Sequence, residues 1–279
     1  MSRVWLISGC STGFGRMLTE KLLAQGECVA ATARNIADLE KLSPPDDDCL
    51  LRAKLDVMRG QQIRDAVSAT LDKFGRIDVL VNNAGYGYFA LAEYGDIDEI
   101  RRMFETNVFG LIRLTQAVLP SMRERRSGVI VNLSSIAGRV AFPRSGFYAA
   151  TKWAVEALSE SLYYEVSPFG IRIILVEPGS FATDFVPRSA VREETMNDPA
   201  SPYAELNQAW NREMAKVLVK GQDPAEVVDG IVAAADREEP FQRLPVGKDA
   251  RMLVEMREGR RAGEFIAAMR ERFGLGPEP

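Results

Sequence analysis

The sequence contains no histidine. This absence excludes catalysis by a Ser-His-Asp or Cys-His arrangement and removes the commonest metal ligand in proteins. Cysteine is also scarce, because only Cys10, Cys28 and Cys49 occur, and none of their spacings forms a C-x-x-C motif. An odd number of scattered cysteines argues against a disulfide framework and against a zinc site. We therefore expect three reduced cysteines that serve as packing residues, and no bound metal.

The chain lacks both a charge excess and a long apolar run. Its 35 basic and 39 acidic residues leave a formal net charge of -4 and are interspersed. No basic stripe is available for nucleic acid, and no apolar run approaches the length that spans a bilayer. The first apolar segment, residues 4–7, lacks the features of a signal peptide. We therefore expect a soluble cytoplasmic protein that has neither nucleic acid nor membrane as a partner.

What the chain does contain is a regular alternation of β-branched or aromatic runs with segments of helical apolar spacing. The expected strands are residues 4–7, 28–33, 50–55, 77–81, 129–133, 171–176 and 241–246. The expected helices are residues 16–25, 36–42, 61–74, 97–122, 145–166, 224–235 and 250–273. This alternation predicts an α/β fold: a Rossmann-like, doubly wound, parallel seven-stranded sheet in the order 3-2-1-4-5-6-7 with helices on both faces. We expect one domain over residues 1–279.

A tyrosine and a lysine four residues apart, Tyr148 and Lys152, stand in one of these helices. Residues at this spacing lie on one helix face about one turn apart. A tyrosine with a pKa of about 10 is a poor base, but a nearby cation favours the phenolate and lowers that pKa. Ser135 could hydrogen-bond the oxygen of a carbonyl or alcohol while Tyr148 exchanges its proton. The alternative is an ordinary solvated helix face, so the interpretation needs a cofactor site elsewhere in the chain.

A glycine-rich turn, Gly9-Cys-Ser-Thr-Gly13-Phe-Gly15, joins the first expected strand to the first expected helix. Glycines let the backbone approach a ligand closely, and the free amides at a helix start suit a pyrophosphate. The spacing differs from the usual G-x-G-x-x-G dinucleotide fingerprint, so a tight turn without a ligand is the alternative.

Polar residues also follow the other expected strands. Arg34 and Asp56 stand where two strands end, in position to contact a nucleotide. The alternative is that each is an ordinary solvated charge. Asn83, within Asn82-Asn83-Ala84-Gly85, can bond backbone or ribose. Asn107 interrupts the apolar side of the helix at 97–122, so its side chain needs a polar partner, either structural or in a relay.

Together these motifs resemble the short-chain dehydrogenase/reductase family, in its compact single-domain branch. The resemblance covers roughly residues 1–185 and rests on the glycine turn, Asp56, the Asn82 to Gly85 motif, Asn107, Ser135, Tyr148-x-x-x-Lys152, and Pro178-Gly179 with Thr183. It implies a catalytic set of Asn107, Ser135, Tyr148 and Lys152. In that set, Asn107 would hold a water that links Lys152 to solvent.

The resemblance also implies a nicotinamide cofactor and the residues that hold it. The pyrophosphate would lie on Gly9, Ser11, Thr12, Gly13, Phe14 and Gly15. Asp56 and Val57 would meet the adenine, and Asn83, Ala84 and Gly85 would flank the ribose. Pro178, Gly179, Phe181 and Thr183 would hold the nicotinamide, whose ribose would also contact Tyr148 and Lys152.

The expected function is an NADP(H)-dependent oxidoreductase that interconverts a carbonyl and an alcohol. Two alternatives stay open. A nucleotide-sugar epimerase or dehydratase uses the same Tyr-x-x-x-Lys pair but resembles the extended branch, with G-x-x-G-x-x-G and a larger C-terminal domain, and neither feature is present. A non-catalytic NADP(H)-binding redox sensor would need no proton relay and typically lacks the tyrosine.

The second expected strand indicates which nicotinamide cofactor is preferred. NAD-selective folds commonly carry an acidic residue there, and Ala33 stands in its place. Arg34 follows, and its guanidinium can donate two hydrogen bonds to a 2′-phosphate. These residues predict NADP(H), although Thr12 stands where some NADP-dependent relatives carry a second basic residue.

Aromatic residues follow or precede several of the motifs, which predicts a small apolar carbonyl or alcohol as the substrate. They are Tyr86, Tyr88, Phe89, Phe142, Phe147, Phe181 and Phe185. We expect Tyr86, Phe142 and Phe185 to contact the substrate together with Ser135 and Tyr148. A long insertion at about 187–220 is expected to form a substrate lid, or else a structural amphipathic helix. Apolar faces on the helices at 97–122 and 145–166 predict a homodimer or homotetramer.

Overall fold

The computed structural model describes residues 2–44, 46–183, 185, 191–192, 198–219 and 222–274. Its main sheet has seven parallel strands in the order β3-β2-β1-β4-β6-β7-β9, which confirms the predicted fold and strand order. The strands are β1 (Val4–Ile7), β2 (Cys28–Ala33), β3 (Leu50–Lys54), β4 (Val79–Asn82), β6 (Gly128–Leu133), β7 (Ile171–Pro178) and β9 (Phe241–Val246). The strand order reverses beside β1, and ligands of such sheets bind at that point, beyond the carboxyl ends of the strands.

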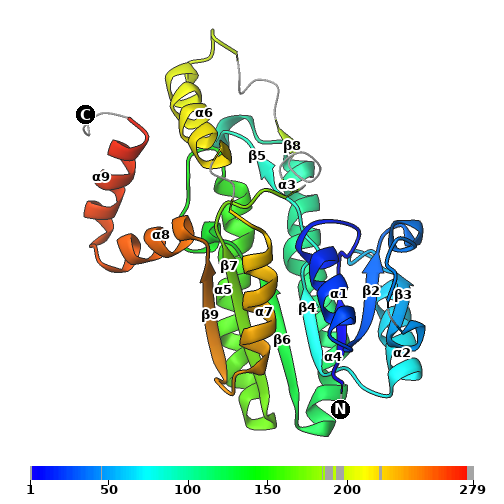
Figure 1. Cartoon of the computed structure of the whole chain (residues 1–279). Coiled ribbons are helices and arrows are strands. Elements are labelled where there is room, and N and C mark those ends of the chain that lie inside the picture. Colours follow the sequence, from blue (N-terminus) through cyan, green and yellow to red (C-terminus); the bar gives the residue numbers. More distant parts are fainter. Residues whose placement is uncertain are drawn as a thin grey trace.

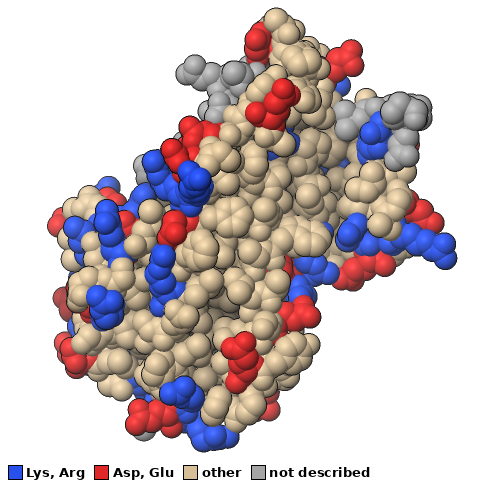
Figure 2. Space-filling model, turned by 180° about the vertical axis from the view of Figure 1, so that it is seen from behind, with Lys and Arg blue, Asp and Glu red and all other residues tan. Residues whose placement is uncertain are grey.

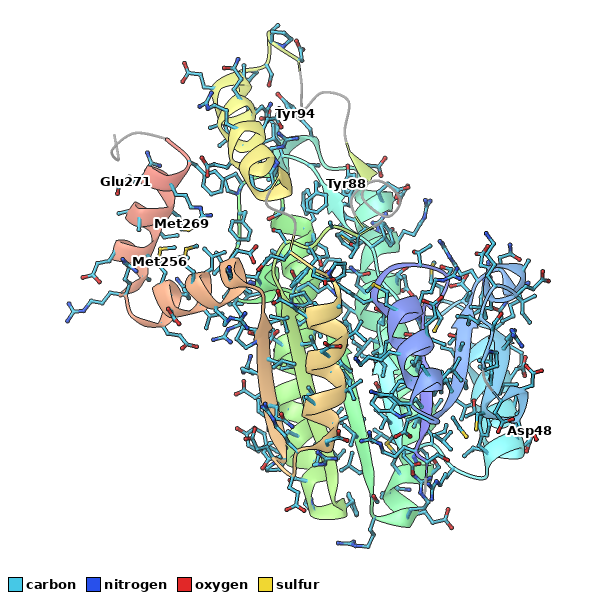
Figure 3. The ribbon with its side chains drawn as sticks, in the orientation of Figure 1. Asp48, Tyr88, Tyr94, Met256, Met269 and Glu271 are labelled. Carbon is cyan, nitrogen blue, oxygen red and sulfur yellow. The ribbon has the colours of Figure 1, made fainter. Side chains whose placement is uncertain are left out.

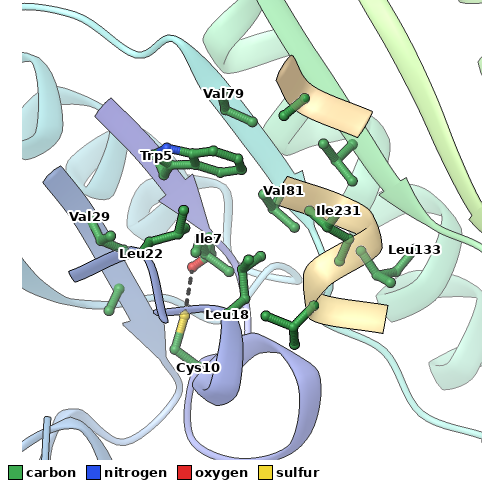
Figure 4. Packing of buried hydrophobic residues seen from close by; sticks show 14 of the residues in the cluster. Trp5, Ile7, Cys10, Leu18, Leu22, Val29, Val79, Val81, Leu133 and Ile231 are labelled. Carbon is green, nitrogen blue, oxygen red and sulfur yellow. Dashed lines mark hydrogen bonds between the residues drawn. The ribbon is translucent and has the colours of Figure 1, made fainter. Parts of the chain in front are cut away.

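Helices cover both faces of this sheet (Figure 1). One face carries α1 (Gly13–Ala24) and α7 (Ala225–Asp236), and the other carries α2 (Gly60–Phe74), α4 (Leu111–Arg125) and α5 (Gly146–Val166). Successive strand residues point to opposite faces, so Trp5 and Ile7 pack with α1 and α7 (Figure 4), while Leu6 packs with the helices of the other face. Both faces are therefore buried, and the central strand β1 is apolar and buried over its whole length.

The long helix expected over residues 97–122 is interrupted. After α3 (Ile97–Phe104) the chain makes a π-helical turn (Glu105–Gly110) and then continues as α4. A single π turn inside a helix widens it locally and is frequent at functional sites. Asn107 lies in this turn and is buried, so its side chain must find polar partners inside the protein. Residues 36–42, also expected to be helical, form only the short 3-10 helix Ile36–Leu39.

The C-terminal segment forms two helices where one was expected over residues 250–273. α8 (Lys248–Glu258) ends at Gly259, and α9 (Ala262–Arg272) follows after a short turn. Their apolar sides form a separate hydrophobic cluster with the loop after β6, and this cluster includes Met256 and Met269 (Figure 3). The prediction of a single helix was wrong because Gly259 weakens helix propagation there and permits the turn.

A second, two-stranded sheet was not expected from the sequence. β5 (Tyr88–Phe89) pairs in parallel with β8 (Val191–Arg192). Of the predicted lid at 187–220, the described residues are 191–192 and 198–219, and the rest lies outside the described part of the chain. Its described helix is α6 (Ala204–Val219), and the lid remains a prediction. Within the described residues, no helix combines the length and apolar character needed to cross a membrane.

Candidate active site

The turn after β1 exposes backbone at the beginning of α1. Gly9 and Gly13 have φ angles of 78° and 58°, in the left-handed region that favours glycine. A Cβ on Gly15 would overlap the carbonyl oxygen of Gly9 and would lie 2.5 Å from Nδ2 of Asn83. Thr12 precedes the helix without making a side-chain capping hydrogen bond, and Ser11 and Phe14 are half-buried in the same turn. This shape fits a phosphate group at the helix amides.

Asn83 fastens this turn to the next strand. Its Nδ2 donates to the carbonyl oxygens of Ser8 and Gly9, each at 2.9 Å. Ser8 Oγ accepts from the amides of Asn83 and Ala84, both at 3.0 Å. The Asn83 side chain is therefore a clamp on the glycine turn. Ser8 was missed from the sequence, and its place directly before the glycine turn is the signal that could have indicated it.

Tyr148 and Lys152 lie on one face of α5 and point toward the carboxyl end of β6. Both are 8% exposed, and Lys152 Nζ lies 5.7 Å from the centre of the Tyr148 ring. Lys152 Nζ donates to the carbonyl oxygen of Leu133 at 2.7 Å, while the Tyr148 phenol is hydrogen-bonded to Ser135. The structure thus brings together three of the four residues predicted as the catalytic set.

The protonation of this pair differs from the expectation. Burial raises the pKa of Tyr148 to about 12, and the hydrogen bond with Ser135 only partly opposes that rise. Burial also lowers the pKa of Lys152 to about 8, against the opposing effect of the Glu156 charge. The expectation that Lys152 would lower the tyrosine pKa is wrong, because burial raises this pKa and only the hydrogen bond with Ser135 opposes the rise.

Asn107, the fourth predicted catalytic residue, bonds to the protein itself. Its Oδ1 accepts from the amide of Tyr86 at 3.0 Å, and its Nδ2 donates to the Tyr86 carbonyl at 2.8 Å and to Thr151 Oγ1 at 3.2 Å. A Cβ on Gly85 would lie 3.0 Å from Asn107 Oδ1 and 3.9 Å from Lys152 Nζ, so both side chains border Gly85. The water relay through Asn107 remains a prediction.

The residues predicted to meet the adenosine part of the cofactor stand at the ends of β2 and β3. Arg34 is exposed directly after β2. Asp56 shapes the turn before α2, because its Oδ1 accepts from the Met58 amide at 3.0 Å and its own amide donates to Gln62 Oε1 at 2.8 Å. Val57 is buried, and a Cβ on Gly110 would overlap it.

The loop after β7 is held in place by residues that the sequence did not indicate. The amide of Gly179 donates to Val246 at 2.9 Å, and that of Ser180 donates to Asp249 Oδ2 at 2.8 Å. Gln222 Nε2 also donates to Asp249, at 2.7 Å. Asp249 and Gln222 lie far along the chain from this loop, so no local signal could have pointed to them.

This loop returns toward the glycine turn. Phe181 is buried and contacts Phe14 edge-on, with the ring centres 5.8 Å apart. The amide of Thr183 donates to the Phe181 carbonyl at 2.9 Å, and Thr183 Oγ1 accepts from the Phe185 amide at 3.3 Å. The segment predicted to hold the nicotinamide thus lies beside the segment predicted to hold the pyrophosphate.

Aromatic side chains surround the Tyr148 ring. Phe89 and Phe185 lie on it, each with ring centres 5.7 Å away, and Tyr86 packs in the same cluster. Phe142 does not, because it contacts Trp210 and Phe273, both at 6.5 Å, within the cluster formed by α8 and α9. The structure therefore does not bring Phe142 to Tyr148 as predicted, since the loop before α5 turns that side chain toward the C-terminal helices.

The chain is similar to known proteins in sequence and fold. The family model described as "short chain dehydrogenase" matches residues 3–194. Oxidoreductase BOA17 of Botryotinia fuckeliana is 34% identical over 277 residues, covering 98% of this chain and 97% of that protein. The 3-ketodihydrosphingosine reductase of Bacteroides thetaiotaomicron is 35% identical over 249 residues, with 88% of each chain covered.

Two solved structures are also similar. A short-chain dehydrogenase from Streptomyces avermitilis superposes with a TM-score of 0.84 at 37% identity, covering 99% of this chain and 98% of the other. ElxO with NADP bound gives a TM-score of 0.72 at 27% identity, covering 88% of this chain and 96% of the other. Both similarities extend beyond the segment matched by the family model.

Proposed function

Since the chain belongs to the short-chain dehydrogenase family and is an oxidoreductase of it, we propose that it reduces a carbonyl group to an alcohol with NADPH as the hydride donor. One observation carries this proposal: the Tyr148 phenol, hydrogen-bonded to Ser135, lies in an apolar cluster with Lys152 on the same helix face. An epimerase or dehydratase and a redox sensor remain the alternatives for the experiment below to separate.

The residues have distinct roles in this reaction. Ser135 holds the carbonyl oxygen, and Tyr148 delivers the proton that this oxygen takes up as it becomes an alcohol. The nicotinamide supplies the hydride when it is bound. A phenol with a pKa of about 12 carries its proton at neutral pH, as the acid in this reduction must. The ammonium group of Lys152 stabilises the phenolate left behind.

The glycine turn and its neighbours fit the cofactor. Gly9, Gly13 and Gly15 leave the amides of α1 open to a pyrophosphate, and Phe181 brings the loop after β7 beside them. We assign a preference for NADP(H) to Arg34, which is exposed at the end of β2 and follows an alanine in the place of an acidic residue. ElxO, at 27% identity, binds NADP, which supports this assignment.

The substrate we propose is apolar. Tyr86, Phe89 and Phe185 supply aromatic surface around the Tyr148 ring. A single apolar contact discriminates between substrates by about 1–3 kcal/mol, so several apolar ketones or aldehydes should be accepted. The relative named as a 3-ketodihydrosphingosine reductase acts on a keto compound, which is consistent with this class.

The test is a panel of apolar and charged carbonyl compounds with NADPH, followed at the nicotinamide absorbance. We expect turnover with apolar ketones or aldehydes and little with small charged keto acids. An epimerase would convert its substrate without net consumption of NADPH, and a sensor would bind NADPH without turnover. Failure of the whole panel, combined with tight NADPH binding, would reject the proposed reductase.

We also propose that the chain self-associates through the outer faces of α3 to α5. Exposed apolar side chains on these elements include Phe109 (45%), Trp153 (46%) and Tyr164 (68%). Figure 2 shows the side of the molecule that carries α4 and α5, with uncharged residues across its middle and charged groups mainly toward its edges. A symmetric dimer or tetramer would cover this surface. Light scattering at micromolar concentration should give a mass of two or four chains, and a monomer would refute the proposal.

A further inference from the structure

A buried acidic residue, Glu156, lies one helical turn beyond Lys152 on α5 and has no role in the reaction described above. Its side chain is 8% exposed and is ion-paired with Arg243 of β9. The neighbouring Glu177 at the end of β7 is fully buried, and its Oε1 lies 3.6 Å from Arg243 Nη1 and 3.1 Å from Arg139 Nη1. Two carboxylates and two guanidiniums thus form a charged cluster beneath the catalytic lysine.

The polar atoms between Lys152 and Glu156 are arranged around the end of β6. Lys152 donates to the carbonyl oxygen of Leu133, and the next residue, Ser134, lies against Glu156. A Cβ on Gly138 would lie 2.7 Å from Ser134 Oγ and 3.1 Å from Glu156 Oε1, so both oxygens border the same small space. The lysine and the carboxylate therefore flank one short segment of backbone.

The charges around Glu156 come from every element that packs on it. Lys152 and Glu160 share its helix, Glu177 belongs to β7, Arg243 belongs to β9, and Arg139 follows the loop after β6. Burial and the charge of Glu177 raise the pKa of Glu156 to about 7, and the charges of Arg243 and Arg139 oppose that rise. The charge of Glu156 in turn raises the pKa of Lys152 against the effect of burial. The charge of Glu156 therefore helps to keep Lys152 ionised.

We propose that Glu156 is a positioning residue that keeps Lys152 in its ammonium form, and that Arg139 and Arg243 keep Glu156 ionised for this purpose. The inference rests on the proposed function, because the ammonium group is what stabilises the phenolate of Tyr148. Each arginine also binds a second, outer acid: Arg139 Nη2 lies 2.6 Å from Glu258, and Arg243 Nη2 lies 2.7 Å from Glu160. The cluster thus ties α8 and β9 to the catalytic helix.

The test compares Glu156→Gln with Glu160→Gln, a matched control on the same helix that removes the outer partner of the same arginine. We expect the midpoint of Lys152 deprotonation to fall by about one pH unit in Glu156→Gln, a shift at the low end of those caused by a close charge. The alkaline limb of kcat/KM should move down by the same amount, which is about a tenfold loss above that midpoint. Glu160→Gln should leave both midpoints unchanged.

Two readouts keep this test independent of the proposed reaction. The Lys152 midpoint is measured by NMR titration of ¹³C-labelled lysine, assigned with Lys152→Arg, and it requires no turnover. If the wild-type protein reduces no carbonyl, the proposed function fails while the titration still decides the role of Glu156. Glu156→Asp, which keeps the charge, should restore most of the wild-type midpoint and serves as the second variant if Glu156→Gln folds poorly. An unchanged Lys152 midpoint in a folded Glu156→Gln protein would overturn the inference.

A second feature, independent of the reaction, lies at the opposite end of the sheet. Cys28 begins β2, and Cys49 directly precedes β3; because Val29 pairs with Leu50, the two cysteines stand side by side on neighbouring parallel strands. Their Sγ atoms are 2.9 Å apart, and both residues are half-buried. Cys10, the third cysteine, is buried and donates to the Ile7 carbonyl at 3.3 Å (Figure 4).

We infer that Cys28 and Cys49 form a redox-sensitive dithiol that peroxide converts to an intramolecular disulfide. One thiolate attacks hydrogen peroxide, which forms a sulfenic acid and releases hydroxide; the second thiol then displaces the sulfenic hydroxyl as water, and the S–S bond forms. The two thiols lose two electrons, and the peroxide is reduced to two waters. The hydrogen bond with Cys28, burial and acidic neighbours raise the pKa of Cys49 to about 11, which disfavours its thiolate.

Peptide mapping after treatment with hydrogen peroxide tests this inference. We expect tryptic peptides 22–34 and 42–52 to be linked, with Cys10 still alkylated, and the melting temperature to rise by several degrees because the bond closes a loop of about twenty residues. Cys28→Ser should remove both effects, and Cys10→Ala should keep them. Complete alkylation of Cys28 and Cys49 after oxidation, or a link that forms only between chains, would refute the dithiol.

Discussion

The half of the site that faces the glycine turn and the half around Tyr148 satisfy their polar groups in different ways. In the first half, the Asn83 side chain donates to the Ser8 and Gly9 carbonyls at the turn, and the Ser8 hydroxyl accepts from the Asn83 and Ala84 amides, all at 2.9–3.0 Å. In the second half, Tyr86 Oη, Ser134 Oγ and Glu156 Oε1 are buried with no hydrogen-bond partner among the described residues. A binding turn must be rigid before its ligand arrives, whereas a reaction centre keeps groups whose partners or charges change during the reaction.

The largest effect should come from the reacting group itself. Tyr148→Phe removes one hydroxyl from an apolar cluster and leaves the ring contacts with Phe89 and Phe185 in place. We expect kcat to fall about 10²–10⁴-fold, with NADPH affinity and the melting temperature nearly unchanged. Steady-state kinetics and fluorescence titration with NADPH measure the two quantities. Wild-type turnover in this variant would falsify the assignment of Tyr148 as the acid.

A substitution in the rigid half should act on binding instead. Gly15→Ala places a Cβ against the Gly9 carbonyl and the Asn83 amide, so the turn must shift. We expect a loss of stability of about 1–3 kcal/mol and NADPH affinity weakened more than tenfold. Gly263→Ala, where a Cβ meets nothing within 4 Å, is the matched control and should be neutral or slightly stabilising. Equal affinity for NADPH in Gly15→Ala and wild type would show that the turn does not hold the cofactor.

Cofactor choice should depend on Arg34, which is exposed directly after β2. With a charge-assisted hydrogen bond contributing about 1.5–3 kcal/mol, NADPH should be preferred over NADH roughly ten- to a hundredfold. Arg34→Ala should erase most of this preference and leave kcat/KM with NADH nearly unchanged, while Ala33→Asp should penalise NADPH selectively. Lys41→Ala, another exposed cation, is the control. A wild-type kcat/KM for NADH equal to that for NADPH would make Arg34 an ordinary surface charge.

The smallest effect should come from an unpartnered hydroxyl of the reaction half. Burial raises the pKa of Tyr86, and its Oη lacks a partner in the described structure. Tyr86→Phe should therefore stabilise the protein without ligand by about 1 kcal/mol, because the cost of a buried, unpaired hydroxyl disappears. Thermal unfolding measures this gain. If the Tyr86 hydroxyl also bonds the substrate, kcat/KM for polar ketones should fall while that for apolar ones is kept. If Tyr86→Phe unfolds at a lower temperature than wild type, the half of the site around Tyr148 does not contain a buried, unpaired Tyr86 hydroxyl, and the proposed difference between the two halves is wrong.

The main helices and strands of this protein, and the order of the strands in the sheet, can be predicted from the sequence. Strands buried on both faces need apolar residues throughout, and amphipathic helices need a period of 3.6, so the elements and their parallel order could be predicted from local patterns. The glycine turn was predictable for the same reason, since a left-handed φ at Gly9 and Gly13 and the overlap at Gly15 are properties of short backbone segments. The Tyr148 and Lys152 pair also depends only on spacing along one helix.

The contacts that these residues make with distant parts of the chain can be seen only in the tertiary structure. The bond of Asn107 to Thr151, the direction of Phe142 toward Trp210, and the contact of Asp249 with the loop after β7 all join segments that are distant in sequence. The same is true of the pKa of Tyr148, because burial raises it and no spacing rule measures burial. In the sequence, Glu156 is simply an acidic residue in an expected helix. It belongs to a buried cluster because Glu177 of β7 and Arg243 of β9 pack beside it. Desolvation and pairing depend on the complete packing of the chain, and local patterns carry no information about them.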